Sequence, residues 1–210
     1  MQIALALYPG FTALDIIGPF QTFADVPGFD CVFVAAEAGP VTDHTGRLQM
    51  VATAAFSDVT APEVVVVPGG MVLPTGDDDP VVQWLRAVHP TTTWTTSVCT
   101  GSLFLGAAGI LDGLDATSHW TAYEILAGYG AHPTGTRVVE QGKVVTAAGV
   151  SAGIDMGLTL VAKLAGDDLA RAIQLAIEYD PQPPFDAGSP EKAGPDLTEL
   201  MRQMMVGGLR

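Results

Sequence analysis

Charged side chains are scarce in this sequence, and basic ones are the scarcest. Asp, Glu, Lys and Arg make up 15% of its 210 residues, against about a quarter in an ordinary soluble domain. There are 9 Lys and Arg against 23 Asp and Glu, a formal net charge of −14. Nucleic acids and anionic membranes require a basic face, so neither is expected as a partner. With 48% hydrophobic residues, much of the chain must be buried in its own core or in a subunit interface.

Cysteines and long hydrophobic runs are also lacking. Two cysteines, Cys31 and Cys99, cannot form a disulfide framework or a Cys-rich metal site, and we expect free thiols in a reducing compartment. No two histidines have metal-ligand spacing, so we expect no metal. The longest hydrophobic stretch, residues 144–165, is interrupted by charged residues and glycines. Since the N-terminus has no basic signal segment, we expect a soluble, cytoplasmic protein.

Short valine-rich runs alternate with helical spacing along most of the chain. This order predicts an α/β fold with a mainly parallel sheet flanked by helices. No repeat or long linker divides the sequence, so we expect residues 1–210 to form one domain, including a proline-rich, extended surface wrap that begins at residue 180. Strands are predicted over residues 2–8, 29–36, 63–67 and 91–96, a β-excursion over 41–50, and a hairpin of 138–140 with 144–147. Helices are predicted over residues 79–88, 102–111, 121–127, 151–164, 168–178 and 195–205.

Residues 96–102 have the pattern of a nucleophile elbow. Cys99 stands where a predicted strand gives way to a predicted helix, with Ser97 two residues before it and Gly101 two after it. Small residues are needed there because larger ones would collide with so sharp a turn. Helix N-terminal amides would lower the pKa of the thiol, and the amide of Thr100 would face the same pocket. The alternative is a buried structural cysteine.

Asp15 is the first candidate partner for this thiol. Proline is tolerated in a first helical turn, so we expect a helix to begin near Pro19 and residues 12–18 to form a loop that carries Asp15. Its neighbours Leu14 and Ile16 are apolar, and burial among them would raise the pKa of the carboxyl. A protonated acid could then hydrogen-bond a thiolate. The alternative role is a cap for the following helix.

Gly69 and Gly70 follow the predicted strand over residues 63–67. Glycines let backbone amides approach a ligand closely, as an anion-stabilising pocket requires, although an ordinary tight turn explains them equally well. Ligand sites of parallel sheets form beyond the carboxyl ends of the strands. Asp15, the two glycines and Cys99 all follow strands in this way, so we expect them to converge.

One histidine is a candidate base. His119 could pair with a catalytic cysteine, but a histidine beside Trp120 is more often a packed, hydrogen-bonded core residue. The remaining histidines, His44, His89 and His132, are predicted to be turn residues.

Several motifs together resemble the ThiJ/PfpI superfamily, a branch of the class I glutamine amidotransferase-like fold, and within it the isocyanide hydratases. Sensor domains of AraC-type regulators share the central motifs but continue into a basic DNA-binding domain. Peptidase-like members have His where this chain has Thr100, and deglycase-like members use Glu where it has Asp15. The matching segments are residues 14–20, 67–70, 97–102, 117–120, 149–155 and 179–186.

The resemblance implies a flavodoxin-like sandwich, a homodimer without metal or organic cofactor, and hydration of a small-molecule isocyanide to an N-substituted formamide. Cys99 would attack the isocyanide carbon, Asp15, protonated at first, would act as acid and base, and Thr100 would assist. We expect substrate contacts from Gly69, Gly70, Val150 and His119. Alternatives left open are a non-catalytic or redox-sensing relative and a glyoxalase- or amidase-like enzyme using the same cysteine.

Overall fold

The computed structural model describes residues 1–206. Its centre is a seven-stranded sheet in the order β10-β11-β7-β6-β1-β2-β5, in which only the edge pair β10–β11 is antiparallel. The predicted α/β fold with a mainly parallel sheet is therefore confirmed. The strands are β1 (Gln2–Ala6), β2 (Asp30–Ala35), β5 (Ala54–Ala55), β6 (Val64–Val67), β7 (Trp94–Val98), β10 (Val138–Gln141) and β11 (Val144–Ala147).

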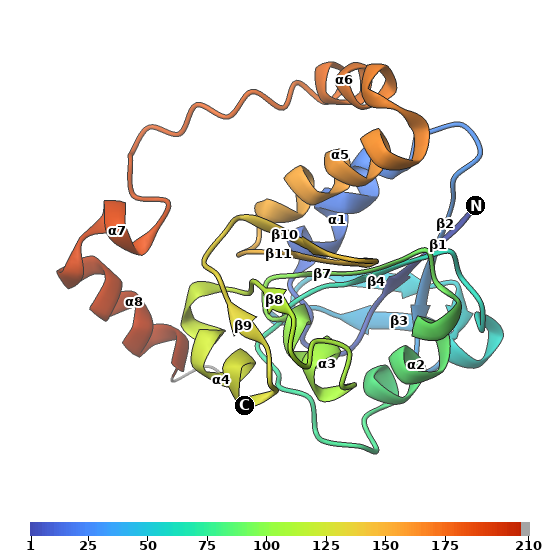
Figure 1. Ribbon diagram of the computed structural model, residues 1–210, viewed down its shortest axis with the longest axis horizontal. Coiled ribbons are helices and arrows are strands. Elements are labelled where there is room, and N and C mark those ends of the chain that lie inside the picture. Colours follow the sequence, from blue (N-terminus) through green and yellow to red (C-terminus); the bar gives the residue numbers. More distant parts are fainter. Residues whose placement is uncertain (207–210) are drawn as a thin grey trace.

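Helices cover both faces of the sheet (Figure 1). The four valines of β6 are fully buried, as a central parallel strand covered on both faces requires. On one face lie α1 (Ala13–Phe23), α5 (Ala152–Ala165) and α6 (Asp167–Ala176). On the other lie α2 (Pro80–Val88), α3 (Gly101–Ala107) and α4 (Tyr123–Gly128). None of the helices within residues 1–206 is long and apolar enough to cross a membrane.

The first helix differs from its prediction. Helix α1 begins at Ala13 and runs through Pro19, so the predicted loop over residues 12–18 is wrong. A proline inside a helix costs about 3 kcal/mol. Complete burial of Ile16 and Phe23 offsets that cost, at about 1.5–3 kcal/mol for each side chain. Asp15 consequently lies in the first turn of a helix rather than in a loop.

Close packing of α1 against α5 explains why α1 remains helical through Pro19. A Cβ added to Gly153 would lie 3.1 Å from Pro19 Cδ, and one added to Gly18 would lie 3.1 Å from Ile154 Cγ1. The two glycines therefore let the helices approach each other, a tertiary contact that local sequence does not reveal.

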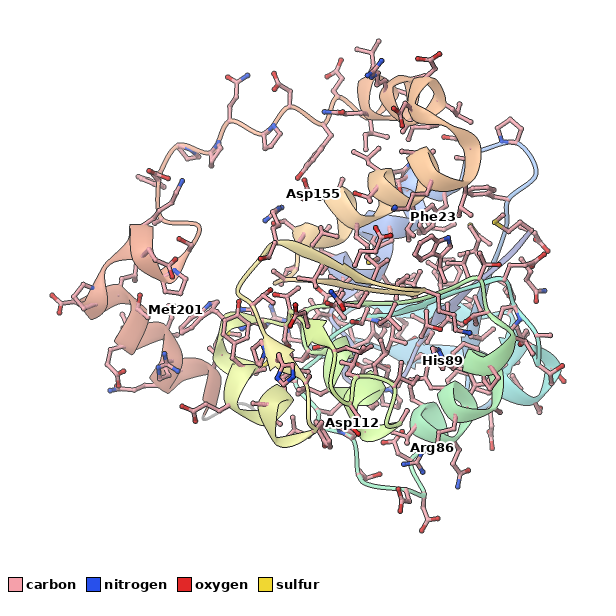
Figure 2. The ribbon with its side chains drawn as sticks, in the orientation of Figure 1. Phe23, Arg86, His89, Asp112, Asp155 and Met201 are labelled. Atoms are coloured by element: carbon pink, nitrogen blue, oxygen red, sulfur yellow. The ribbon has the colours of Figure 1, made fainter. Side chains whose placement is uncertain are left out.

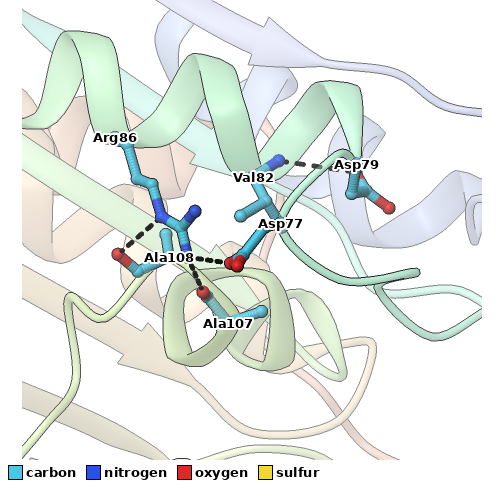
Figure 3. Close-up of polar contacts among 6 residues, drawn as sticks. All are labelled: Asp77, Asp79, Val82, Arg86, Ala107 and Ala108. Carbon is cyan, nitrogen blue, oxygen red and sulfur yellow. Dashed lines mark hydrogen bonds and ion pairs between the residues drawn. The ribbon is translucent and has the colours of Figure 1, made fainter.

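Two elements around the elbow are shifted from their predictions. A 3₁₀ turn, η2 (His89–Thr91), precedes β7, which therefore begins later than expected and ends at Val98. Helix α3 ends at Ala107, four residues earlier than predicted. Arg86 of α2 accounts for this end, because Nη2 donates to the Ala107 carbonyl at 2.7 Å and Nε to the Ala108 carbonyl at 3.4 Å (Figure 3). A cation on the last carbonyls stabilises a helix C-terminus.

The remaining small elements surround the carboxyl edge of the sheet. The predicted β-excursion is an antiparallel pair of strands. Separately, Ser151 occupies the N-cap position of α5, but its side chain makes no capping hydrogen bond. The pair consists of β3 (Gly39–Thr42) and β4 (Gln49–Ala52), and the others are η1 (Phe56–Asp58), β8 (Asp115–Ala116), β9 (His132–Pro133) and η3 (Trp120–Ala122).

The C-terminal segment forms an arm. Residues 181–188 are extended and exposed, but they arc outward from α6 instead of wrapping over the surface as predicted (Figure 1). The chain then returns through α7 (Pro190–Ala193) and α8 (Pro195–Val206), and α8 contacts η3. This return brings α8 back to the carboxyl edge of the sheet, where Met205 lies near Cys99.

Candidate active site

Cys99 occupies the predicted elbow between β7 and α3. Its φ of 58° lies in the left-handed region, which a non-glycine residue adopts only under strain. Its N–H donates to the carbonyls of Ala147 at 3.0 Å and Ala148 at 2.9 Å. Its carbonyl accepts from the hydroxyls of Ser102 at 3.2 Å and Ser118 at 3.1 Å. These bonds hold the strained backbone in place.

Gly101 is the small residue on which the elbow depends. A Cβ at this position would collide with the Val67 carbonyl oxygen and would lie 2.8 Å from that of Pro68. The elbow therefore packs directly on the end of β6. The sequence predicted that a side chain here would collide with the turn itself, whereas in the structure it would collide with backbone carbonyls at the end of β6.

The structure brings the Asp15 carboxyl to the Cys99 thiol. Asp15 is fully buried, and its Oδ2 accepts from the Gly69 amide at 2.8 Å. Its Oδ1 has no N–H or O–H partner within the described residues. Burial raises the pKa of this carboxyl to about 7, while the Gly69 amide and the Cys99 thiol act in the opposite direction. The expected raised pKa of Asp15 thus has the expected cause, desolvation.

The thiol itself differs from expectation. Burial, together with the nearby negative charge of Asp15, raises the pKa of Cys99 to about 12. The backbone amides of Val150 and Thr100 lower the pKa, as helix N-terminal amides should, but they do not outweigh burial. The predicted net lowering is therefore wrong. At neutral pH the thiol keeps its proton, and the neighbouring carboxyl, near the midpoint of its titration, can receive it.

The glycine pair serves a different purpose from the one predicted. The Gly69 amide is bonded to Asp15, and the Gly70 amide donates to Thr100 Oγ1 at 2.9 Å. The same hydroxyl donates to the Gly70 carbonyl at 3.0 Å. A Cβ on Gly69 would lie 2.7 Å from Asp15 Oδ2 and from Thr100 Oγ1. The pair therefore holds Asp15 and Thr100 in position, and its amides are not free to bind an anion in the resting state.

A cavity of about 210 Å³ opens onto the sulfur. Of the residues expected in the site, Cys99, Thr100, Gly70, Val150 and His119 line it, while Gly69 and Asp15 lie behind its wall. The remaining lining residues are Thr12, His44, Met71, Thr121 and Met205. Val150 has a φ of 26°, so two residues that line this cavity, Cys99 and Val150, have a positive φ.

Two histidines contribute polar groups to this cavity. His119 Nδ1 lies 2.7 Å from Thr121 Oγ1, and burial lowers the pKa of the imidazole, which keeps it neutral. His44 was predicted to be a turn residue without a role. It lies in the turn between β3 and β4, but its N–H donates to the Phe11 carbonyl at 2.9 Å, which brings it to the cavity. No local signal identifies His44, because a contact between distant segments places it.

A larger cavity, about 620 Å³, lies elsewhere. It is lined by residues such as Leu7, Val41 and Pro80, and it includes neither Cys99 nor Asp15. Within residues 1–206, no group of three or more His, Cys, Asp or Glu side chains is placed to hold a metal. The site therefore offers a thiol, a carboxyl and neutral hydrogen-bonding groups around a small cavity.

A parallel α/β sheet with a cysteine elbow and a buried acid defines an α/β protein of the cysteine-nucleophile class. Residues 1–163 match the family model described as DJ-1/PfpI family, and the chain belongs to that family. It is 40% identical over 211 residues to an isonitrile hydratase from Pseudomonas putida, covering 100% of this chain and 92% of the relative.

Two further relatives bear on the fold and on the alternatives. A crystal structure of a ThiJ/PfpI family protein from Pseudomonas syringae has a TM-score of 0.90 and 39% identity, covering 99% of this chain and 87% of that chain. The HTH-type transcriptional regulator CdhR of Pseudomonas aeruginosa is 27% identical over 78% of this chain, which matches only 51% of the regulator.

Proposed function

We propose that this protein is an isocyanide hydratase, which adds water to an isocyanide, R–NC, to give an N-substituted formamide, R–NH–CHO. One observation carries the proposal from the structural side: the buried Asp15 carboxyl lies against the Cys99 thiol at the wall of a small cavity. The similarity to an isonitrile hydratase over the whole chain supports the same activity.

In the first step, the Cys99 sulfur attacks the terminal carbon of the isocyanide. Because the thiol is protonated at neutral pH, its proton moves to the ionised Asp15 carboxylate as the S–C bond forms. Asp15 then gives this proton to the isocyanide carbon, which yields a thioimidate, R–N=CH–S–Cys99. The sequence predicted a protonated Asp15 carboxyl beside a Cys99 thiolate. In the reactive form of the pair the same proton lies on the sulfur instead, and the carboxyl is ionised.

In the second step, water attacks the thioimidate carbon. Asp15 takes a proton from the water and passes it to the nitrogen, which gives the tetrahedral species R–NH–CH(OH)–S–Cys99. The C–S bond then breaks as the hydroxyl proton moves through Asp15 to the sulfur, so the formamide leaves and the thiol recovers its proton. The overall reaction consumes one water and needs neither electrons nor a metal or organic cofactor, so we propose that none is used.

The surrounding residues would position these two groups. The amides of Val150 and Thr100 lower the pKa of Cys99, which means that they favour negative charge on sulfur during attack and departure. Gly69 and Thr100 hold the acid and the elbow through the hydrogen bonds described above. Val150, Gly70 and His119 line the space that the substrate must enter.

Burial argues against the redox-sensor alternative. Oxidation requires an exposed thiolate, whereas Cys99 is 6% exposed and has a raised pKa. We further propose that the protein is a cytoplasmic, single-domain homodimer. Its two free cysteines favour a reducing compartment, and exposed apolar side chains on α1, Leu14 and Ile17, favour a subunit interface.

The experiment is formamide release from an alkyl isocyanide by the purified protein, followed by chromatography. Cys99→Ala should abolish turnover, and Asp15→Asn should reduce kcat at least about a hundredfold, since an amide cannot carry the proton and general acid–base catalysis contributes 10²–10⁴-fold. Cys31→Ser is the matched control and should retain the wild-type rate. Turnover by Cys99→Ala would exclude the mechanism, and a wild-type rate for Asp15→Asn would exclude the role of Asp15.

A further inference from the structure

The C-terminal arm supplies part of the wall of the Cys99 cavity. Met205, on α8, lines that cavity together with Cys99 itself. A second cavity, of about 280 Å³, lies between the arm and the segment that contains His119 and Trp120. His119 and Met205 line both cavities, so the two adjoin. The space beneath the arm thus begins where the Cys99 cavity ends, at His119 and Met205.

One face of α8 forms the apolar side of this second cavity. Leu197, Met201 and Met205 line it, and their spacing of four residues places them along one side of a helix. Leu200 and Met204 lie next to this row on the helix but do not line the cavity, and they are 53% and 64% exposed, against 43% for Leu197 and 37% for Met201. Figure 2 shows Met201 on the side of α8 that faces the body of the molecule.

The arm is held to the body by few contacts. The guanidinium of Arg202 lies 5.2 Å from the ring centroid of Trp120, a cation–π contact. The connection over residues 181–188 is exposed throughout. Methionine side chains are flexible and adapt to the shape of what they contact. This wall can therefore fit apolar groups of different shapes, but it offers nothing to a charged group.

The geometry of the substrate requires space for its substituent away from the sulfur. In R–NC the carbon must reach the Cys99 sulfur, and the linear C–N–R axis carries the substituent R away from the sulfur. We propose that the second cavity receives the substituent R, and that α8 thereby selects isocyanides with long apolar substituents. This inference rests on the proposed function, because it concerns the substrate of the same site.

The test compares kcat/KM for ethyl isocyanide and n-octyl isocyanide in two variants of α8. Met201→Gln places a polar group in the second cavity, and Met204→Gln makes the same change at a more exposed position that does not line this cavity. We expect Met201→Gln to lower kcat/KM for the octyl substrate about tenfold and to leave the ethyl substrate within about twofold. Met204→Gln should leave both unchanged. Equal losses for the two substrates, or no loss, in Met201→Gln would overturn the inference.

A second measurement separates this inference from the proposed function. In a Cys31→Ser background, Cys99 is alkylated with N-ethylmaleimide or N-octylmaleimide, and the modified peptide is followed by mass spectrometry. Met201→Gln should slow the octyl reagent about tenfold relative to the ethyl reagent even if no isocyanide is hydrated, in which case only the proposed function fails. If both reagents respond alike, the arm does not select the substituent.

Discussion

Burial of Asp15 and Cys99 side by side raises both pKa values, so their titrations are coupled and belong to the pair. The cause is the same for both groups, because each loses water around its charged form. A thiol that is protonated at rest is protected from oxidation, and in the proposed mechanism the nearby carboxylate is the base that activates it when substrate binds.

The raised pKa of Asp15 makes folding stability depend on pH. Its value is about 7 in the folded protein against 3.8 for an unperturbed aspartate carboxyl, so the native state binds more protons between these values. Stability from this group is complete below about pH 4 and is lost as pH rises through about 7. At about 1.4 kcal/mol per pKa unit, the loss amounts to about 4 kcal/mol.

Asp15→Asn should therefore gain stability relative to wild type as pH rises from about 4 to about 8, because asparagine carries no charge to bury. Urea unfolding followed by circular dichroism at several pH values measures the difference. Parallel stability curves for the two proteins would contradict the raised pKa.

Gly101→Ala should destabilise the protein by more than about 3 kcal/mol, because its methyl group would collide with backbone that cannot move without disturbing β6. Gly128→Ala is the matched control, since a Cβ there meets nothing within 4 Å and the residue lies in a helix. It should be neutral or slightly stabilising. Thermal unfolding of both variants provides the measurement, and equal melting temperatures would show that the elbow tolerates a side chain.

At the scale of elements, α1 shows how packing overrides a local signal. Sequence placed a helix boundary at Pro19 because proline lacks an N–H, and that reasoning is sound for an isolated segment. Contact between α1 and α5 reverses the outcome through Gly18 and Gly153. The shift matters for the site, since it places Asp15 on a rigid helix that directs the carboxyl at the thiol.

The contact of Arg86 with the end of α3 should contribute to stability, because it joins α2 to α3. Arg86→Ala should destabilise the protein by about 1 kcal/mol, the low end for hydrogen bonds from a charged group, as its side chain is 41% exposed. Arg171→Ala is the control, because its ion pair with Asp168 is almost fully exposed and should contribute almost nothing. Chemical denaturation distinguishes the two, and equal effects would contradict the capping role of Arg86.

At the scale of the whole molecule, both the hydrophobic composition and the exposed apolar side chains favour the proposed subunit interface. Leu14 and Ile17 on α1 are 44% and 37% exposed, and Leu48 and Val51 near the β3–β4 turn are 39% and 61% exposed. Scattered apolar residues are ordinary, but neighbouring ones on a helix are typical of interfaces.

The double variant Leu14→Glu and Ile17→Glu should convert the proposed homodimer to a monomer, because two carboxylates cannot be buried without partners. Light scattering coupled to size-exclusion chromatography measures the mass of both proteins. A wild-type protein that is itself monomeric, or a variant that remains dimeric, would contradict an interface on α1.

The amino-acid sequence by itself determined the parallel α/β architecture and the elbow at Cys99, and it identified Asp15 as a candidate partner of the thiol. Valine runs, small residues at fixed spacing and a carboxyl among apolar neighbours are local signals, so they can be read along the chain. The observed boundaries of β7 and α3 differ from the predicted ones, because a 3₁₀ turn and a capping arginine from another helix decide them.

Only the tertiary structure decided the protonation of the thiol, the use of the Gly69 and Gly70 amides, and the presence of His44 and Met205 at the cavity. Each of these depends on which distant segments meet and on how much water they exclude. Desolvation and hydrogen bonding between remote residues are properties of the folded packing, and no pattern along a single chain encodes them locally.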